Sequence, residues 1–184
     1  MKRLLFSAIC CLALAAGAQE RAIRATVIVP ASIDDVWTAW TTREGITGFF
    51  APDANVDARV DGPFEVFFNP YAAPGMRGAD GMRFLSLQDR KMITFTWNAP
   101  PTMPEVRKQR TYVTVRLHAK GEKQTEVTLY HGGWGEGEEW DRALAYFEKS
   151  WPNVLRSLEL RFTKGPTDWT DWLAKMRAAP APRK

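Results

Sequence analysis

Cysteine and histidine are scarce in this chain. Its 184 residues include two cysteines, Cys10 and Cys11, and two histidines, His118 and His131. Both cysteines lie in an apolar stretch near the start, so the rest of the chain has no thiol for a disulfide or a metal site. Neither histidine has a metal-binding spacing of His and Glu around it, and no Gly-x-Ser-x-Gly motif is present. The sequence therefore predicts no metal, no cofactor and no common hydrolase nucleophile.

A large excess of charge is also missing. The chain has 25 basic and 21 acidic residues, a formal net charge of +4. Lys2 and Arg3 supply half of this excess, so the remaining chain is close to neutral at about +2. Nucleic-acid-binding domains depend on basic surfaces. We expect no nucleic-acid partner.

The chain lacks an apolar run long enough to cross a membrane, which takes roughly 20 residues. It does begin with a shorter run. Residues 1–18 combine Lys2 and Arg3, an apolar stretch over 4–14 and small residues at 16–18. This is the pattern of a secretory signal peptide. We expect cleavage near Ala18-Gln19, no membrane span, and export to the periplasm or the medium.

Alternating apolar and polar residues predict about seven β-strands. The first strand covers residues 22–30 and stops at Pro30. Six more are expected as pairs within residues 54–68, 82–97 and 111–131, each pair joined by a polar or glycine-containing turn. Clean alternation is typical of an antiparallel sheet with one buried face. Such a sheet needs a helix to cover that face.

Helical patterns surround these strands. Ser32 predicts the start of a short helix with an apolar stripe at positions 33, 36, 37 and 40, and a second short helix is expected from Thr42. A longer stripe, with Leu, Phe and Trp at steps of three and four, runs over residues 140–162. Pro152 interrupts it, so we expect a kink there or a new helix capped by Ser150.

Together these elements predict an α+β helix-grip fold. A curved antiparallel sheet of about seven strands would wrap around a long C-terminal helix, with two short helices after the first strand. The predicted domain covers residues 19–165. Residues 166–184 would form a short amphipathic extension and a disordered tail.

The order of elements and five motifs resemble the SRPBCC (START-like, helix-grip) superfamily, and within it the AHSA-type branch, named after activators of the ninety-kilodalton heat-shock-protein ATPase. The resemblance spans residues 22–163 through VPASIDDVWTAWTTREGITGFF, DARVDGPFEVFF, LSLQDRKMITFTW, TEVTLYHGGW and SWPNVLRSLELRF. It implies a deep apolar cavity for hydrophobic molecules; some relatives are enzymes and many are carriers. The chain departs from the family at Asp61-Gly62-Pro63, which replaces the usual Gly-Gly, and in its long loop over residues 69–81.

We therefore expect an exported protein that binds a small hydrophobic molecule, lipid-like or aromatic, in an aromatic-rich cavity. Pockets of this kind are mostly apolar, with few polar groups. Export argues against the family's cytosolic chaperone as a partner. The residues expected to line the cavity are Phe49, Phe50, Phe67, Phe95, Trp97, His131, Trp134 and Trp151.

His131 leaves two alternatives open. On its strand it shares a face with Val127 and Leu129, so it could orient a ligand or serve as the acid or base of a cyclase or lyase. Glu65, Arg83 and Tyr112 would be the other polar candidates. Alternatively, His131 is a core residue bonded to a backbone carbonyl. We favour this structural role because no catalytic constellation accompanies the histidine.

The C-terminal extension suggests a third class of function. Trp169, Trp172, Leu173 and Met176 form a short amphipathic stripe. This stripe could dock a protein partner, or a second copy of the chain in a homodimer if it does not fold back.

Overall fold

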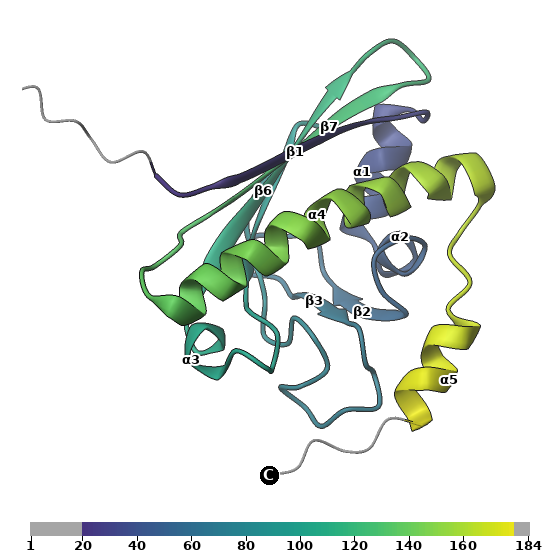
Figure 1. Cartoon of the computed structure of the whole chain (residues 1–184). Coiled ribbons are helices and arrows are strands. Elements are labelled where there is room, and N and C mark those ends of the chain that lie inside the picture. The colour runs from purple at the N-terminus through teal and green to yellow at the C-terminus, as the bar shows by residue number, and fades with distance from the viewer. Residues whose placement is uncertain (1–19, 179–184) are drawn as a thin grey trace, which may run out of the picture.

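Seven β-strands form two antiparallel sheets in the computed structural model, which describes residues 20–178 (Figure 1). The expected signal peptide (1–18) and the end of the expected tail (179–184) lie outside this range. The larger sheet has the order β1-β7-β6-β5-β4. Its strands are β1 (Ile23–Val29), β4 (Phe84–Gln88), β5 (Met92–Trp97), β6 (Thr111–Ala119) and β7 (Thr125–Gly132).

The smaller sheet pairs β2 (Asp53–Val56) with β3 (Phe64–Phe67). Two backbone hydrogen bonds join it to the start of β4: the Phe64 N–H donates to the Met82 carbonyl at 2.9 Å and the Phe84 N–H to the Gly62 carbonyl at 3.0 Å. The smaller sheet thus extends the larger one beyond β4, and the predicted set of about seven strands is confirmed.

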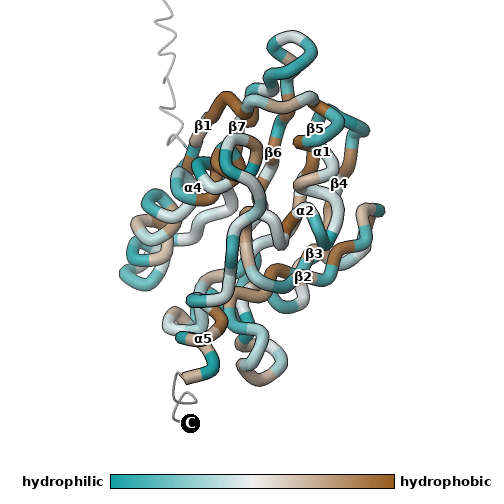
Figure 2. The backbone as a smooth tube through the Cα atoms, turned by 90° about the vertical axis from the view of Figure 1, so that its right-hand side faces the viewer, coloured by the Kyte–Doolittle hydropathy of each residue, from teal (hydrophilic) through white to brown (hydrophobic). Residues whose placement is uncertain are grey.

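The alternation in the sequence separates the two faces of the sheet. In β6, Val113, Val115 and Leu117 are buried, whereas the alternate residues Tyr112 and Thr114 are partly exposed. Figure 2 shows the hydrophobic segments within the strands and a hydrophilic turn where β6 passes into β7. The buried face carries the core of the protein.

Five helices accompany the sheets in the described range: α1 (Ile33–Thr41), α2 (Arg43–Thr47), α3 (Pro104–Arg107), α4 (Glu138–Lys164) and α5 (Thr170–Ala178). The two short helices after β1 are confirmed. The Asp35 N–H donates to the Ser32 hydroxyl at 3.1 Å, and the Gly45 N–H to the Thr42 hydroxyl at 2.9 Å, so both expected caps are formed. No helix within residues 20–178 is both long enough and apolar enough to cross a membrane.

The long helix α4 runs unbroken through Pro152 and lies across the buried face of the sheet (Figure 1). Of the two alternatives that Pro152 left open, a new helix capped by Ser150 is wrong: the Ser150 hydroxyl donates to the Tyr146 carbonyl at 2.8 Å, inside the helix. Pro152 is exposed, so its ring points away from the core. The stripe that faces the sheet consists of Phe147, Trp151, Leu155 and Leu158. A sheet closed over one long helix is the helix-grip arrangement.

The C-terminal extension folds back onto the body. The indole N–H of Trp169 donates to the Thr47 carbonyl and that of Trp172 to the Phe68 carbonyl, both at 2.6 Å. Helix α5 thereby lies beside the segments that follow α2 and β3 (Figure 1). Both tryptophans of the amphipathic stripe are thus hydrogen-bonded within the chain. The homodimer through this stripe was expected only if the stripe did not fold back, and that condition is not met.

Candidate functional site

A pocket of about 110 Å³ opens between α4 and the loops at one end of the sheet. Its walls come from four places in the sequence: the segment after α2, the segment from β3 to residue 79, the end of β5 with the loop after it, and the middle of α4. The residues that line it are Phe50, Phe68, Gly78, Ala79, Trp97, Asn98, Ala99, Pro100, Pro101, Tyr146, Phe147, Ser150, Trp151 and Val154.

Three of the aromatic residues that were predicted to line the cavity meet in this pocket. Phe50 stacks on Trp97, with ring centroids 5.7 Å apart and an angle of 18° between the planes. Trp151 meets Phe50 edge-on at 5.9 Å and lies 5.4 Å from Trp97. Phe68 and Phe147 extend this cluster on either side, at 5.7 Å from Phe50 and 6.0 Å from Trp151. Five rings therefore shape the apolar wall.

The polar lining is sparse and uncharged. Among the described residues that line the pocket, none is Asp, Glu, Lys, Arg or His. The polar side chains are those of Asn98, Ser150 and Tyr146, and Tyr146 is 45% exposed at the rim. A wall of this composition suits a neutral, largely apolar molecule.

Asp80 holds the loop that forms one side of the pocket mouth. Its carboxylate accepts hydrogen bonds from the Gly75 N–H at 3.0 Å, the Gly78 N–H at 2.9 Å and the Arg77 Nε at 2.8 Å. Burial raises the pKa of Asp80, but the hydrogen bonds from Arg77, Gly75 and Gly78 more than offset this, so that the pKa lies below its usual value. Asp80 is thus an ionised, buried anchor for residues 69–81.

Arg107, on α3, joins this loop to the opposite side of the mouth. Its guanidinium donates to the carbonyls of Gly75, Gly78 and Ala99, and lies 3.7 Å from the Asp80 carboxylate. Burial lowers the pKa of Arg107 below its usual value. Because Gly78 and Ala99 line the pocket, the Asp80–Arg107 pair fixes the width of its mouth.

His131 lies behind the aromatic wall and is fully buried. The Trp151 indole N–H donates to Nδ1 at 2.8 Å, and Nε2 lies 2.7 Å from the Thr111 hydroxyl. Because an indole only donates, Nδ1 must accept, so the neutral ring carries its proton on Nε2 and donates it to Thr111. The Thr111 hydroxyl in turn lies 3.3 Å from the Trp97 carbonyl, to which it donates.

This chain of hydrogen bonds connects two walls of the pocket, Trp151 and Trp97, through His131. The histidine is bonded to two side chains and not to the backbone carbonyl that we expected. Burial lowers the pKa of His131 to about 3, so the ring is neutral at physiological pH. Both nitrogens are engaged and the ring does not line the pocket, so no free nitrogen faces a ligand.

The other four residues expected to line the cavity lie away from the pocket. Phe49 and Phe95 pack against the buried Trp40, at 5.1 and 6.4 Å between ring centroids. Phe67 lies beneath the Arg77 guanidinium at 3.9 Å. Trp134 covers His131 at 4.3 Å and donates its indole N–H to the His131 carbonyl.

The remaining polar candidates also lie outside the pocket. Glu65 accepts from the Asn55 amide and the Gly81 N–H, and Arg83 donates to the Asp61 carbonyl. Hydrogen bonding with Tyr130, together with burial, raises the pKa of Tyr112 to about 12. Within residues 20–178, no group of three or more His, Cys, Asp or Glu side chains is arranged to hold a metal ion.

Sequence reasoning missed the loops that complete the pocket. Residues 78–79 and 98–101 lie outside helices and strands, so no periodicity marks them. Arg107 and Asp80 are 27 positions apart, and their contact follows from the fold and not from a motif. One signal was available: the sequence NAPP directly after a predicted strand marks an abrupt change in chain direction.

The fold agrees with that of known proteins. It resembles MLL2253 from Mesorhizobium loti (TM-score 0.62, 18% identity, covering 80% of this chain and 100% of the other). It also resembles CalU16 from Micromonospora echinospora, with a TM-score of 0.58 and 20% identity over 86% of this chain and 83% of the other. The third example is the Aha1 dimer from Colwellia psychrerythraea, with a TM-score of 0.57 and 23% identity over 79% of this chain and 98% of the other. At these identities the likeness shows the fold alone.

The sequence comparison identifies the family. A search of curated proteins finds no significant match. Residues 30–163, well over half of the chain, match the family described as Activator of Hsp90 ATPase homolog 1-like protein. The chain therefore belongs to this family, the AHSA-type branch of the SRPBCC superfamily.

Proposed function

We propose that the protein binds a small, neutral, hydrophobic molecule in the pocket between α4 and the end of β5. The observation that carries this proposal is the wall itself: five aromatic rings converge on an opening whose described lining has no charged side chain. Burial of apolar surface against such rings is worth about 25 cal/mol per Å².

The size of the pocket limits the ligand. Its volume of about 110 Å³ is below the range of roughly 300–1,000 Å³ that holds drug-sized molecules. An apolar cavity of about 150 Å³ is known to hold benzene. The ligand is therefore a single-ring compound, or one end of a longer molecule whose remainder extends past the half-exposed Tyr146.

A pocket-filling substitution tests this function. Val154→Phe places a ring in the pocket from its half-buried position on α4, and ethylbenzene should then bind at least about tenfold more weakly. Trp97 and Trp151 line the site, so tryptophan fluorescence and calorimetry both report binding. Val60→Phe makes the same change at an exposed position on the loop after β2 and should leave affinity unchanged. Failure of the wild-type protein to bind any neutral one-ring probe, or equal binding of ethylbenzene by Val154→Phe, would overturn the proposal.

We also propose that the protein acts after export. This proposal is supported by the charged, apolar and small-residue pattern of residues 1–18. Export would separate the protein from a cytosolic chaperone, so we do not assign it ATPase activation. Nor do we extend the dimeric state of the Colwellia relative to this chain, because Trp169 and Trp172 are bonded within it.

Export is tested by the intact mass of the protein recovered from a periplasmic extract. The expected mass is that of a chain beginning at Gln19. Native mass spectrometry of the same sample would reveal a co-purified ligand as an extra mass that organic solvent removes. Recovery of the full-length chain from the cytoplasm alone would contradict the export proposal and leave the pocket proposal standing.

A further inference from the structure

Asn98 lies in the pocket wall directly after β5, between Trp97 and Ala99. It is 7% exposed, among the most buried polar residues of the described chain. Its position is fixed from both sides. The Trp97 carbonyl before it accepts the Thr111 hydroxyl, and Pro100 and Pro101 soon after it restrict the backbone. Asn98 is therefore part of a rigid wall.

Among residues 20–178, the Asn98 side-chain amide has no hydrogen-bond partner. None of the side-chain hydrogen bonds found within residues 20–178 involves it, in contrast to the equally buried Asp80 and Thr111. The one fully enclosed side-chain nitrogen or oxygen without a partner in that range is the Trp40 indole nitrogen. The amide atoms of Asn98 therefore still reach open space, and the pocket is the space that Asn98 borders.

The Asn98 amide is free to pair with a bound molecule. A ligand that excludes water from the pocket must replace the hydrogen bonds of this amide, because leaving a buried polar group unpaired is unfavourable. A carboxamide offers both an N–H donor and a carbonyl acceptor. Nearby, the Ser150 hydroxyl has committed its proton to the Tyr146 carbonyl, so it can only accept from a ligand. The polar part of the wall is complementary to a group that both donates and accepts.

We propose that Asn98 selects neutral one-ring aromatic compounds that carry an amide. The ring occupies the aromatic wall, and the ligand's amide pairs with the Asn98 side chain. Carboxylates are disfavoured because no described lining residue is cationic, and purely apolar compounds leave the Asn98 amide unpaired. This inference rests on the proposed binding function and adds the chemical class of the ligand.

The test compares three probes of similar size: benzamide, benzoate and ethylbenzene. The wild-type protein should bind benzamide most tightly. Asn98→Leu, which keeps the size of the side chain and removes the amide, should weaken benzamide binding about tenfold and leave ethylbenzene unchanged or tighter. Asn153→Leu makes the same change at an exposed position on α4 that does not line this pocket, and should leave benzamide affinity unchanged.

The outcomes separate the two proposals. If ethylbenzene binds but benzamide affinity is the same in wild type and Asn98→Leu, or benzoate binds as well as benzamide, the selectivity proposal is overturned and the pocket function stands. If no probe binds the wild-type protein, both fail. Should Asn98→Leu not fold, the side-chain amide signal of Asn98 in the wild-type NMR spectrum decides: it should shift further with benzamide than with ethylbenzene, whose ring alone can shift it, and equal shifts reject the proposal.

Discussion

Acidification from pH 7 to pH 5 is expected to lower the free energy of unfolding by about 2 kcal/mol through His131 alone. The folded protein holds this ring neutral, with a pKa lowered to about 3 by burial, whereas the unfolded chain takes up the proton near pH 6.5. Between these two values the unfolded state binds more protons than the folded state. Stability is therefore complete above about pH 6.5 and is lost as the pH falls toward 3.

The hydrogen bonds explain why the folded protein resists this proton. A second proton on the ring would sit on Nδ1, which accepts the Trp151 indole N–H at 2.8 Å. Two donors would then face each other in a site without access to water. The loss of stability between pH 7 and pH 5 is also distinct from any effect of Asp80, because the pKa of Asp80 lies below its usual value near 4.

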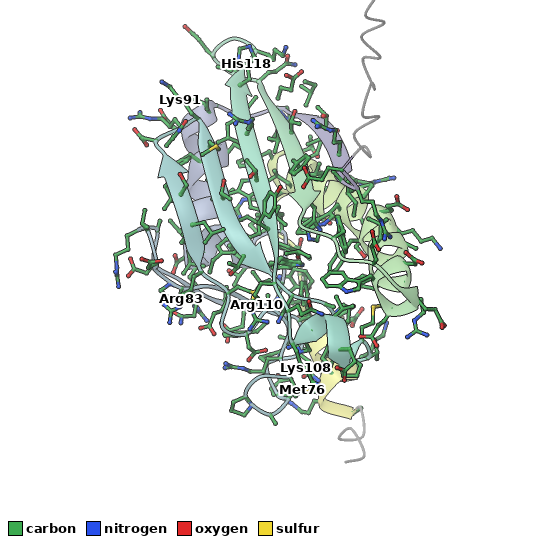
Figure 3. The ribbon with its side chains drawn as sticks, turned by 90° about the vertical axis from the view of Figure 1, so that its left-hand side faces the viewer. Met76, Arg83, Lys91, Lys108, Arg110 and His118 are labelled. Carbon is green, nitrogen blue, oxygen red and sulfur yellow. The ribbon has the colours of Figure 1, made fainter. Side chains whose placement is uncertain are left out.

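Chemical denaturation at pH 7 and pH 5 checks this expectation. His131→Phe removes the titrating group and should reduce the difference between the two pH values by about 2 kcal/mol. His118→Gln removes the other histidine, from the exposed end of β6 (Figure 3), and should keep the full difference. A wild-type ring whose NMR signals titrate near pH 6.5 would show instead that His131 is open to solvent.

The fold could be predicted because it depends on patterns within short segments. The alternation of Val113, Val115 and Leu117 defines the buried face of β6, and Ser32 defines where α1 begins. Such signals need only a few neighbouring residues. The site is different, because the partners of His131 are Thr111 and Trp151, each 20 positions away.

These partners are brought together by the register of β6 on β7 and by the rotation of α4, which no local pattern specifies. Val113 pairs with His131 across the two strands, and this register places Thr111 beside the ring. The same limit applies to the pocket. Phe50 and Trp97 could be named as candidates from their place near element ends, but Phe49 and Trp134 looked equivalent and pack elsewhere.

Asp80→Asn is expected to lower the free energy of unfolding by about 3 kcal/mol, because it removes the negative charge beside the buried Arg107. The Asp80 side chain is 8% exposed, and both its oxygens accept hydrogen bonds. An asparagine has one acceptor oxygen, so its amide nitrogen would face N–H donors. The Arg107 guanidinium would keep its carbonyl partners but lose its counter-charge.

Asp57→Asn is the matched control, since it breaks an Asp–Arg pair that solvent screens. The Asp57 and Arg59 side chains are 49% and 68% exposed, and loss of such a pair costs less than about 1 kcal/mol. The Arg107 guanidinium donates to the Gly75 carbonyl where the loop over residues 69–81 meets α3. Because this contact fixes the pocket mouth, Asp80→Asn should also weaken ethylbenzene binding. Equal, small losses in the two variants would mean that hydrogen bonds to the backbone, without the charge, are enough to hold the loop.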